Sequence, residues 1–136
     1  MEVSVDHVAI LVKDINEAGK FYRDILGLEL TRERELNRGT PGAFREAYYQ
    51  IGDFHVELMA PTGPDSTILN RTLEKRGEGL HHYCFKVSEM DTVIQRCQAA
   101  GIRLVDSFGE IVKIGGTNAY TDPRVTHRTV IQFHPK

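Results

Sequence analysis

The sequence predicts a mixed α+β fold in which two βαβββ modules form an incomplete barrel. Two stretches with the same layout are the first evidence. Residues 81–87 alternate polar and apolar side chains like a half-buried strand, and a helix with a candidate N-cap follows at once. Residues 6–12 show the same arrangement near the start of the chain. The chain therefore contains two copies of one structural unit.

A fixed spacing links polar side chains of the two copies. His82 follows His7 by 75 positions, and Gln132 follows Glu57 by the same 75 positions. Self-similarity at a constant offset indicates a duplicated architecture. We therefore expect one domain over residues 1–136, with module one at about 3–60, a connector at about 61–79 and module two at about 80–135.

Cap and turn signals place the elements of the first module. Asp14 is a candidate N-cap with Glu17 three residues later, and Gly27 is suited to end the helix that follows. Gly52 and Asp53 predict a hairpin turn. The expected elements are a strand over about 3–12, a helix with Ile15, Ala18, Phe21 or Tyr22, and Ile25 toward the sheet, and strands over about 28–35, 44–51 and 54–59.

The connector and the second module are predicted in the same way. A short helix over about 66–75 is expected to turn Ile68, Leu69 and Leu73 inward. Ser88 is a candidate N-cap for a helix that ends at Gly101. The remaining strands are expected at about 81–87, 104–108, 111–114, 118–121 and 129–133, with turns at 115–116 and 122–123.

Strand parity gathers four polar side chains on the inward faces of the two modules. Two sheets of this size cannot each bury a face well alone, so side by side they should enclose a cavity. The strand faces toward this cavity carry four polar side chains: His7, Glu57, His82 and Gln132. Their apolar neighbours in the sequence lie on the opposite strand faces. Two imidazoles, a carboxylate and an amide oxygen suit a divalent ion such as Zn, Co, Ni, Mn or Fe. The sequence therefore predicts a metal-binding cavity with these four ligands.

A single strand histidine is more commonly structural than a ligand, so the shared offset carries this prediction. His55 and His134 share the parity of Glu57 and Gln132 and are expected at the cavity rim. His81 and His127 are interpreted as structural, and Cys84 as a small buried thiol.

Composition excludes several other classes of partner. The formal net charge of -2 gives no general attraction to nucleic acid. No apolar run approaches the roughly 20 residues of a membrane span, and residues 1–4 lack the features of a signal peptide. Cys84 and Cys97 do not suggest a disulfide framework. We therefore expect a cytoplasmic protein in a reducing compartment.

Four segments resemble the vicinal oxygen chelate superfamily, which includes glyoxalase I, methylmalonyl-CoA epimerases, extradiol dioxygenases and bleomycin-resistance proteins. They are DHVAI at 6–10, FYRDILG at 21–27, VELMAP at 56–61 and GEGLHH at 77–82. Together with the segment 65–77, these look most like the methylmalonyl-CoA epimerase branch. The similarity covers nearly the whole chain.

The resemblance implies a metal-dependent epimerase or isomerase that works through a metal-stabilised enolate of an acyl-CoA thioester. The family's ligand positions match His7, Glu57, His82 and Gln132 here. A bound divalent ion would polarise the thioester carbonyl, so that a base can exchange the α-hydrogen. The resemblance also implies a homodimer.

Two departures affect the proton transfer. The last ligand is usually Glu, and Gln132 cannot act as a base; near Thr40 and Pro41, where the epimerases carry an acid, no carboxylate is found. Our hypothesis is that Glu57 serves as both ligand and base, with Glu46 a less favoured helper.

Three alternatives stay open. A glyoxalase I-like lyase would act on a glutathione adduct. A dioxygenase would hold Fe(II) through the two histidines and the carboxylate. A non-catalytic protein of the same fold would use the cavity to bind a small molecule.

Overall fold

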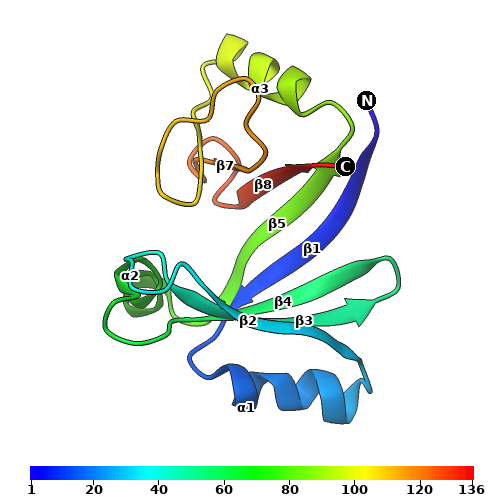
Figure 1. Ribbon diagram of the computed structural model, residues 1–136, viewed down its shortest axis with the longest axis vertical. Helices are drawn as coiled ribbons and strands as arrows, with labels where there is room; N and C mark the ends of the chain where they lie inside the picture. The colour runs from blue at the N-terminus through cyan, green and yellow to red at the C-terminus, as the bar shows by residue number, and fades with distance from the viewer. The chain divides into compact units, whose positions relative to one another are not determined.

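A computed structural model describes residues 1–136 (Figure 1). Its strands are β1 (Val3–Leu11), β2 (Leu30–Leu36), β3 (Phe44–Ile51), β4 (Phe54–Ala60), β5 (Gly79–Val87), β6 (Leu104–Val105), β7 (Ala119–Thr121) and β8 (Val130–Pro135). Its α-helices are α1 (Ile15–Lys20), α2 (Thr67–Arg76) and α3 (Met90–Ala99). The strands form an open sheet in the order β2-β3-β4-β1-β5-β8-β7-β6. The predicted α+β fold of two βαβββ modules with an unclosed sheet is confirmed.

Two compact units divide the chain, and the division cuts through β1 and β5. One unit is His7–His81, and the other combines Met1–Asp6 with His82–Lys136. Each unit therefore holds one module together with a short strand segment from the other module. The predicted module boundaries at about 3–60 and 80–135 stay predictions.

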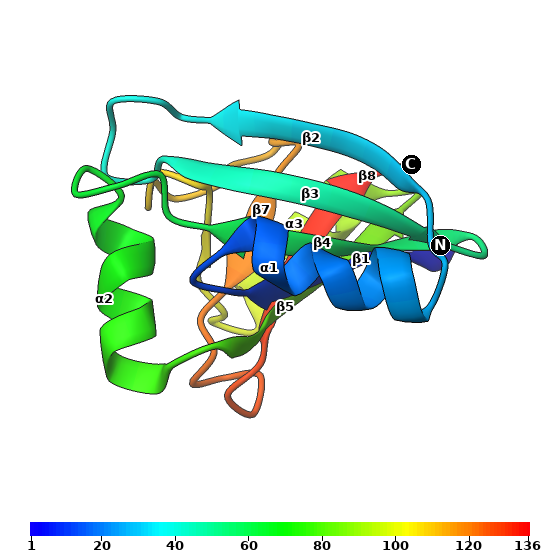
Figure 2. The same ribbon diagram turned by 90° about the horizontal axis from the view of Figure 1, so that it is seen from below.

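In the unit His7–His81, β4 pairs with β1 in parallel and with β3 in antiparallel register, and β3 pairs with β2. Helix α1 packs on β3 and β4, as Figure 2 shows. Two apolar clusters fill this unit. One lies under α1 and includes Ile15, Tyr49 and Leu58, and the other joins Leu11 and Leu69. Val56 and Leu58, which were predicted to oppose the polar set, lie in the first cluster, whereas Leu11 of the second cluster shares the strand face of His7.

In the other unit, β5 pairs with β8 in parallel register, and β8, β7 and β6 follow in antiparallel pairs. Helix α3 supplies Met90, Val93 and Ile94 to an apolar cluster with Leu104 and Ala119. The helix and the strands thus bury the second module's core in the way that the first module does.

The helix after β1 begins as predicted and then changes its winding. Asp14 Oδ1 accepts hydrogen bonds from the backbone amides of Asn16 and Glu17, at 2.9 and 3.0 Å. Beyond Lys20 the chain widens into a π-helical turn over Phe21–Ile25. Because this turn breaks the 3.6-residue period, Phe21 and Ile25 are exposed rather than facing the sheet. The prediction that Ile25 packs inward is wrong, as it is for Ile68 of α2, which is exposed while its neighbour Leu69 is buried.

Three further predictions for the second module are wrong. The first residue flanking α3 is Glu89, whereas the Ser88 hydroxyl accepts a hydrogen bond from the Glu2 amide instead of capping the helix. The strand expected at 104–108 stops at Val105. The strand expected at 111–114 is only an isolated bridge at Ile111. Asp106 Oδ1 accepts from the amides of Phe108 and Glu110, and this folds the segment into a loop.

Candidate functional site

His7 and Glu57 lie together on one face of the unit His7–His81. Ala9 of β1 is the register partner of Glu57 on β4, so side-chain alternation along parallel strands places His7 and Glu57 on the same face. Their ligand atoms lie within 4.8 Å of each other. The two residues are only 2% and 4% exposed. The structure thus brings together the two predicted ligands of the first module.

Tyr48 joins this pair, although the sequence did not single it out. It stands directly across from Glu57 in the antiparallel β3–β4 ladder. Its hydroxyl lies 3.3 Å from His7 Nδ1 and also forms a side-chain hydrogen bond with Glu57. Its ring meets the imidazole of His7 edge-on, with centroids 5.4 Å apart. The phenol therefore contacts both predicted ligands of this half.

Glu46 places a second buried carboxyl beside Glu57. It is 1% exposed and forms ion pairs with Arg34 and with Arg32, whose Nε lies 3.0 Å away. The Arg32 guanidinium also covers the Tyr48 ring at 4.0 Å from its centroid. The sequence analysis did not single out these two arginines. Both arginine side chains are partly exposed, but each guanidinium pairs with the buried carboxylate of Glu46.

The pKa of the Glu57 carboxyl is raised well above its ordinary value. Burial is the largest cause, followed by the hydrogen bond and the charge of Glu46. The hydrogen bond from Tyr48 and the charge of Arg32 act in the opposite direction. Burial also raises the pKa of Tyr48, which keeps the phenol protonated and able to donate. The metal-free site therefore favours a proton on Glu57.

The second module carries His82 on β5 and Gln132 on β8. Gln132 is the register partner of Cys84, two residues from His82, so the amide and the imidazole share a face. Both are buried. Tyr120 stands directly across from Gln132 in the β7–β8 ladder, and its ring meets the His82 ring edge-on at 5.7 Å. This half repeats the arrangement of the first half.

Gln132 is held by its amide nitrogen. Nε2 lies 2.9 Å from Asn118 Oδ1, 2.9 Å from the Tyr120 hydroxyl and 2.7 Å from His134 Nε2. The amide oxygen Oε1 is buried and has no hydrogen-bond partner. An unsatisfied buried acceptor is costly, so this oxygen is suited to meet a cation or a donor.

The other residues singled out from the sequence divide between site and scaffold. His55 packs against the Tyr48 ring at 5.3 Å, and His134 bonds Gln132. Their place at a cavity rim stays a prediction. Burial, and then the charge of Arg76, lower the pKa of His81 to about 4, in keeping with a structural role. His127 lies in the loop before β8 with a positive φ of 55°.

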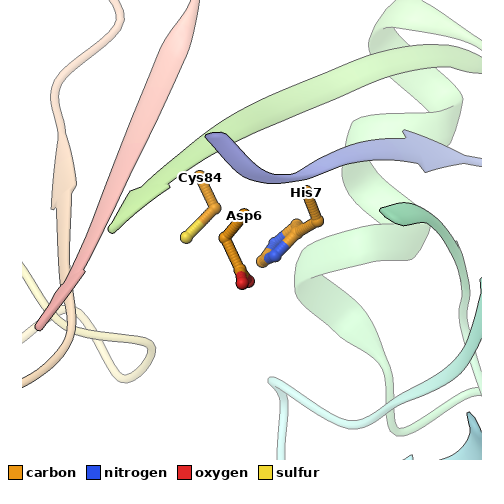
Figure 3. A group of neighbouring side chains, drawn as sticks. All are labelled: Asp6, His7 and Cys84. Atoms are coloured by element: carbon orange, nitrogen blue, oxygen red, sulfur yellow. The ribbon is translucent and has the colours of Figure 1, made fainter. Parts of the chain in front are cut away.

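Cys84 is fully buried, as predicted. Figure 3 draws it with Asp6, whose carboxylate lies within 4.8 Å of the thiol sulfur, and with His7, which follows Asp6 in the chain. The Asp6 carboxylate forms an ion pair with Lys86 at 2.9 Å. Because this lysine neutralises the acid, the pair Asp6 and Cys84 is the weaker candidate for a cation.

A cavity of about 450 Å³ opens among the loop residues 106–118 of the second unit. Phe108, Ile111 and Ile114 form an apolar part of its lining, and Lys113 supplies a cation. Asn118 also lines it, while bonding Gln132. A ligand in this cavity would contact the residue that holds the Gln132 amide.

The donors present fit a divalent ion. Each half offers one imidazole nitrogen and one oxygen: His7 with Glu57, and His82 with Gln132. Nitrogen and oxygen donors of this kind are typical ligands of Zn, Co, Ni, Mn and Fe. The unpartnered Oε1 of Gln132 and the buried carboxyl of Glu57 are both groups that a cation would stabilise.

Comparison with known proteins identifies the family. The family model described as Glyoxalase/Bleomycin resistance protein/Dioxygenase superfamily matches residues 6–120. The chain belongs to this superfamily. The resemblance inferred from the sequence motifs is thereby confirmed.

Within the superfamily, the chain is similar to methylmalonyl-CoA epimerases. It is 32% identical over 133 residues to the ethylmalonyl-CoA/methylmalonyl-CoA epimerase of Cereibacter sphaeroides, a match that covers 97% of this chain and 88% of that protein. It is also 32% identical to the human mitochondrial methylmalonyl-CoA epimerase over 133 residues, but spans only 66% of that protein's length. The solved methylmalonyl-CoA epimerase of Mycobacterium tuberculosis aligns with a TM-score of 0.77 at 27% identity, over 96% of this chain and 86% of that one.

These relatives support an enzyme of the superfamily. The ligand set His7, Glu57, His82 and Gln132 and the base role of Glu57 stay predictions. No helix of the structure is long and apolar enough to cross a bilayer.

Proposed function

We propose that this protein is a metal-dependent epimerase of acyl-CoA thioesters of the methylmalonyl-CoA type. One observation carries the proposal: a chain 32% identical to such epimerases buries the Glu57 carboxyl beside His7, with its pKa raised. A carboxyl with a raised pKa is a stronger base than an ordinary one. A homodimer and a cytoplasmic location belong to the proposal as well.

His7, Glu57, His82 and Gln132 would hold the ion. When bound, a divalent ion would polarise the thioester carbonyl and acidify the neighbouring carbon. Gln132 supplies a neutral oxygen and no proton, so proton transfer falls to other groups. Glu57 would remove the hydrogen from the carbon between the thioester and the carboxylate. Return of a proton from water to the opposite face of that carbon would complete the inversion, and Glu57 would then release its proton to solvent.

Glu46 would assist Glu57. The two carboxyls are hydrogen-bonded, and Arg32 and Arg34 balance the charge of Glu46. A proton gained by Glu57 can therefore be shared within a buried pair whose charge is already partly compensated. This contact makes Glu46 a more serious candidate for the proton relay than the sequence suggested.

The apolar and cationic lining of the cavity at residues 106–118 supports a long, partly charged substrate such as an acyl-CoA. Phe108 and Ile111 are exposed large apolar side chains in the loop that lines it. Lys113 lies between them and Asn118 along the chain, and could meet a phosphate of the carrier.

Deuterium exchange tests the function and separates the two carboxyls. The protein, loaded with Co²⁺, is incubated with methylmalonyl-CoA in D₂O, and incorporation at the α-carbon is followed by mass spectrometry. We expect exchange in the wild type and a loss of at least about 100-fold in Glu57→Gln. A larger loss in Glu46→Gln than in Glu57→Gln would move the base to Glu46.

A parallel incubation with the glutathione hemithioacetal of methylglyoxal tests the lyase alternative. Turnover of this adduct with no exchange into methylmalonyl-CoA would replace the epimerase proposal. If the protein binds methylmalonyl-CoA but turns over neither thioester, the non-catalytic binding protein is the correct alternative.

A further inference from the structure

Each half of the fold places a tyrosine directly across from its oxygen ligand. Tyr48 pairs with Glu57 in the antiparallel β3–β4 ladder, and Tyr120 pairs with Gln132 in the antiparallel β7–β8 ladder. Direct cross-strand partners share one face and have neighbouring side chains. The duplication therefore extends beyond the four predicted ligands to a third side chain in each half.

The contacts of the two tyrosines are also alike. Each ring meets the histidine of its own half edge-on, at 5.4 Å for Tyr48 with His7 and 5.7 Å for Tyr120 with His82. Each hydroxyl bonds the oxygen-ligand residue of its own half: Tyr48 bonds Glu57, and Tyr120 lies 2.9 Å from Gln132 Nε2. Two unrelated positions would not share both the register and the contacts.

In the second half, the hydroxyl is one of three contacts to Gln132 Nε2 that together set which end of the amide faces outward. Gln132 has one acceptor end and one donor end of nearly equal size. Tyr120, Asn118 and His134 surround the nitrogen, so the buried oxygen is left to face a ligand. If the Tyr120 hydroxyl did not contact Nε2, the Gln132 amide could rotate. It would then turn its N–H groups toward the ligand, and N–H groups repel a cation.

In the first half, the hydroxyl decides which nitrogen of the imidazole can bind. Tyr48 has a single hydrogen, and the bond to Glu57 uses it. Its oxygen then accepts from His7 Nδ1, 3.3 Å away, so the ring carries its proton there. In this tautomer Nε2 carries the ring's lone pair and is the nitrogen that can coordinate a cation. Outer hydrogen bonds of this type fix both the tautomer and the direction of a metal-binding imidazole.

We infer that Tyr48 and Tyr120 are a pair of positioning residues, one in each half, that orient His7 with Glu57 and Gln132 for binding a divalent cation. This inference rests on the metal site of the proposed function. The two tyrosines act through the ligands and need not touch the substrate.

Metal affinity measures this role directly. Co²⁺ is titrated into the metal-free protein and its binding followed by calorimetry and by the visible d–d spectrum, without substrate. We expect Tyr48→Phe and Tyr120→Phe each to weaken Co²⁺ binding by roughly ten-fold, the effect of losing an outer-sphere partner. Tyr49→Phe and Tyr83→Phe, which lose hydroxyls on the opposite faces of β3 and β5, are the matched controls and should leave the affinity within about two-fold.

A double-mutant cycle separates positioning from a general loss of structure. If Tyr120 acts through Gln132, Tyr120→Phe should change the affinity by less than about two-fold once Gln132→Ala is present. An equal loss in both backgrounds would overturn the role of Tyr120. Unchanged affinity in Tyr48→Phe would overturn the role of Tyr48.

The metal-free protein gives a second measurement. The side-chain amide signals of Gln132, assigned by their absence in Gln132→Ala, should be protected from solvent exchange in the wild type and should shift and exchange faster in Tyr120→Phe. If these signals are the same in Tyr120→Phe as in the wild type, Tyr120 does not hold the Gln132 amide. If the wild type bound no Co²⁺, the metal site would be wrong, yet these signals would still decide whether Tyr120 holds the amide. The Co²⁺ titration and the Gln132 amide signals are both recorded without substrate. A protein that proves to have no epimerase activity would therefore leave both tests of the tyrosines intact.

Discussion

Replacing Glu57 by glutamine should stabilise the metal-free protein. The carboxyl is 4% exposed and lies beside Glu46, which is 1% exposed, so its ionised form is disfavoured by burial and by like charge. The side-chain amide introduced by Glu57→Gln carries no charge at any pH and can donate to Glu46 while accepting from Tyr48. The substitution therefore removes a penalty without removing the hydrogen-bonding partners.

The size of this effect follows from the pH. Because the folded-state pKa is raised above the ordinary value of 4.5, the carboxyl destabilises the fold increasingly as the pH rises above that value. Each pH unit adds about 1.4 kcal/mol until the folded-state pKa is reached. At pH 7 the gain from Glu57→Gln therefore has a ceiling of about 3.5 kcal/mol, and below about pH 4.5 it disappears.

Urea unfolding in the presence of EDTA measures this gain at several pH values. Glu33→Gln is the control, because Glu33 is an acid of β2 whose side chain is 42% exposed and whose ion pair with Arg45 should be worth less than about 1 kcal/mol. The reasoning is refuted if Glu57→Gln is less stable than the wild type at neutral pH, or if the difference between them does not grow with pH.

Three further predictions follow from particular contacts. Saturating Co²⁺ should stabilise the wild type, by about 2.7 kcal/mol at 100 times the dissociation constant; EDTA should reverse the shift in thermal unfolding, and His7→Ala should abolish it. The His81 imidazole should titrate near pH 4 by NMR, since burial disfavours its charged form; it should therefore lower stability as the pH falls below about 6.5, and a measured pKa of 6.5 would contradict this. Gly19→Ala should cost about 1–3 kcal/mol in urea unfolding, because a Cβ there would overlap the hydroxyl of the buried Tyr49; an unchanged midpoint would show that the ring can move.

The first half of the fold could be predicted closely from the sequence because its signals are local. Asp14 caps its helix as expected, and a two-residue turn at Gly52 and Asp53 joins β3 to β4. That turn also fixes the register, so Tyr48 opposite Glu57 could have been inferred from it. What parity alone did not show is the charge network around Glu46, because side-chain alternation says nothing about ion pairs across three strands.

The second half was less predictable because its apolar residues do not mark strands. Phe108, Ile111 and Ile114 are all exposed in a loop that Asp106 stabilises through its side chain. The long connection between β7 and β8 fixes no register, so the pairing of Tyr120 with Gln132 had no local signal. The π-helical turn after α1 likewise arises without a proline or glycine within it.

The division of β1 between the two units limits how this chain can be taken apart. Residues 1–6 are covalently continuous with the first module but are fastened to the second: the Glu2 carbonyl accepts from the Ser88 amide at 3.0 Å, and Lys136 Nζ reaches the Glu2 carboxylate. A cut in the connector would leave the C-terminal fragment without its bordering strand segment and the N-terminal fragment with an unpaired tail. Complementation of two fragments, rather than independent folding of either, is the behaviour that this exchanged segment imposes.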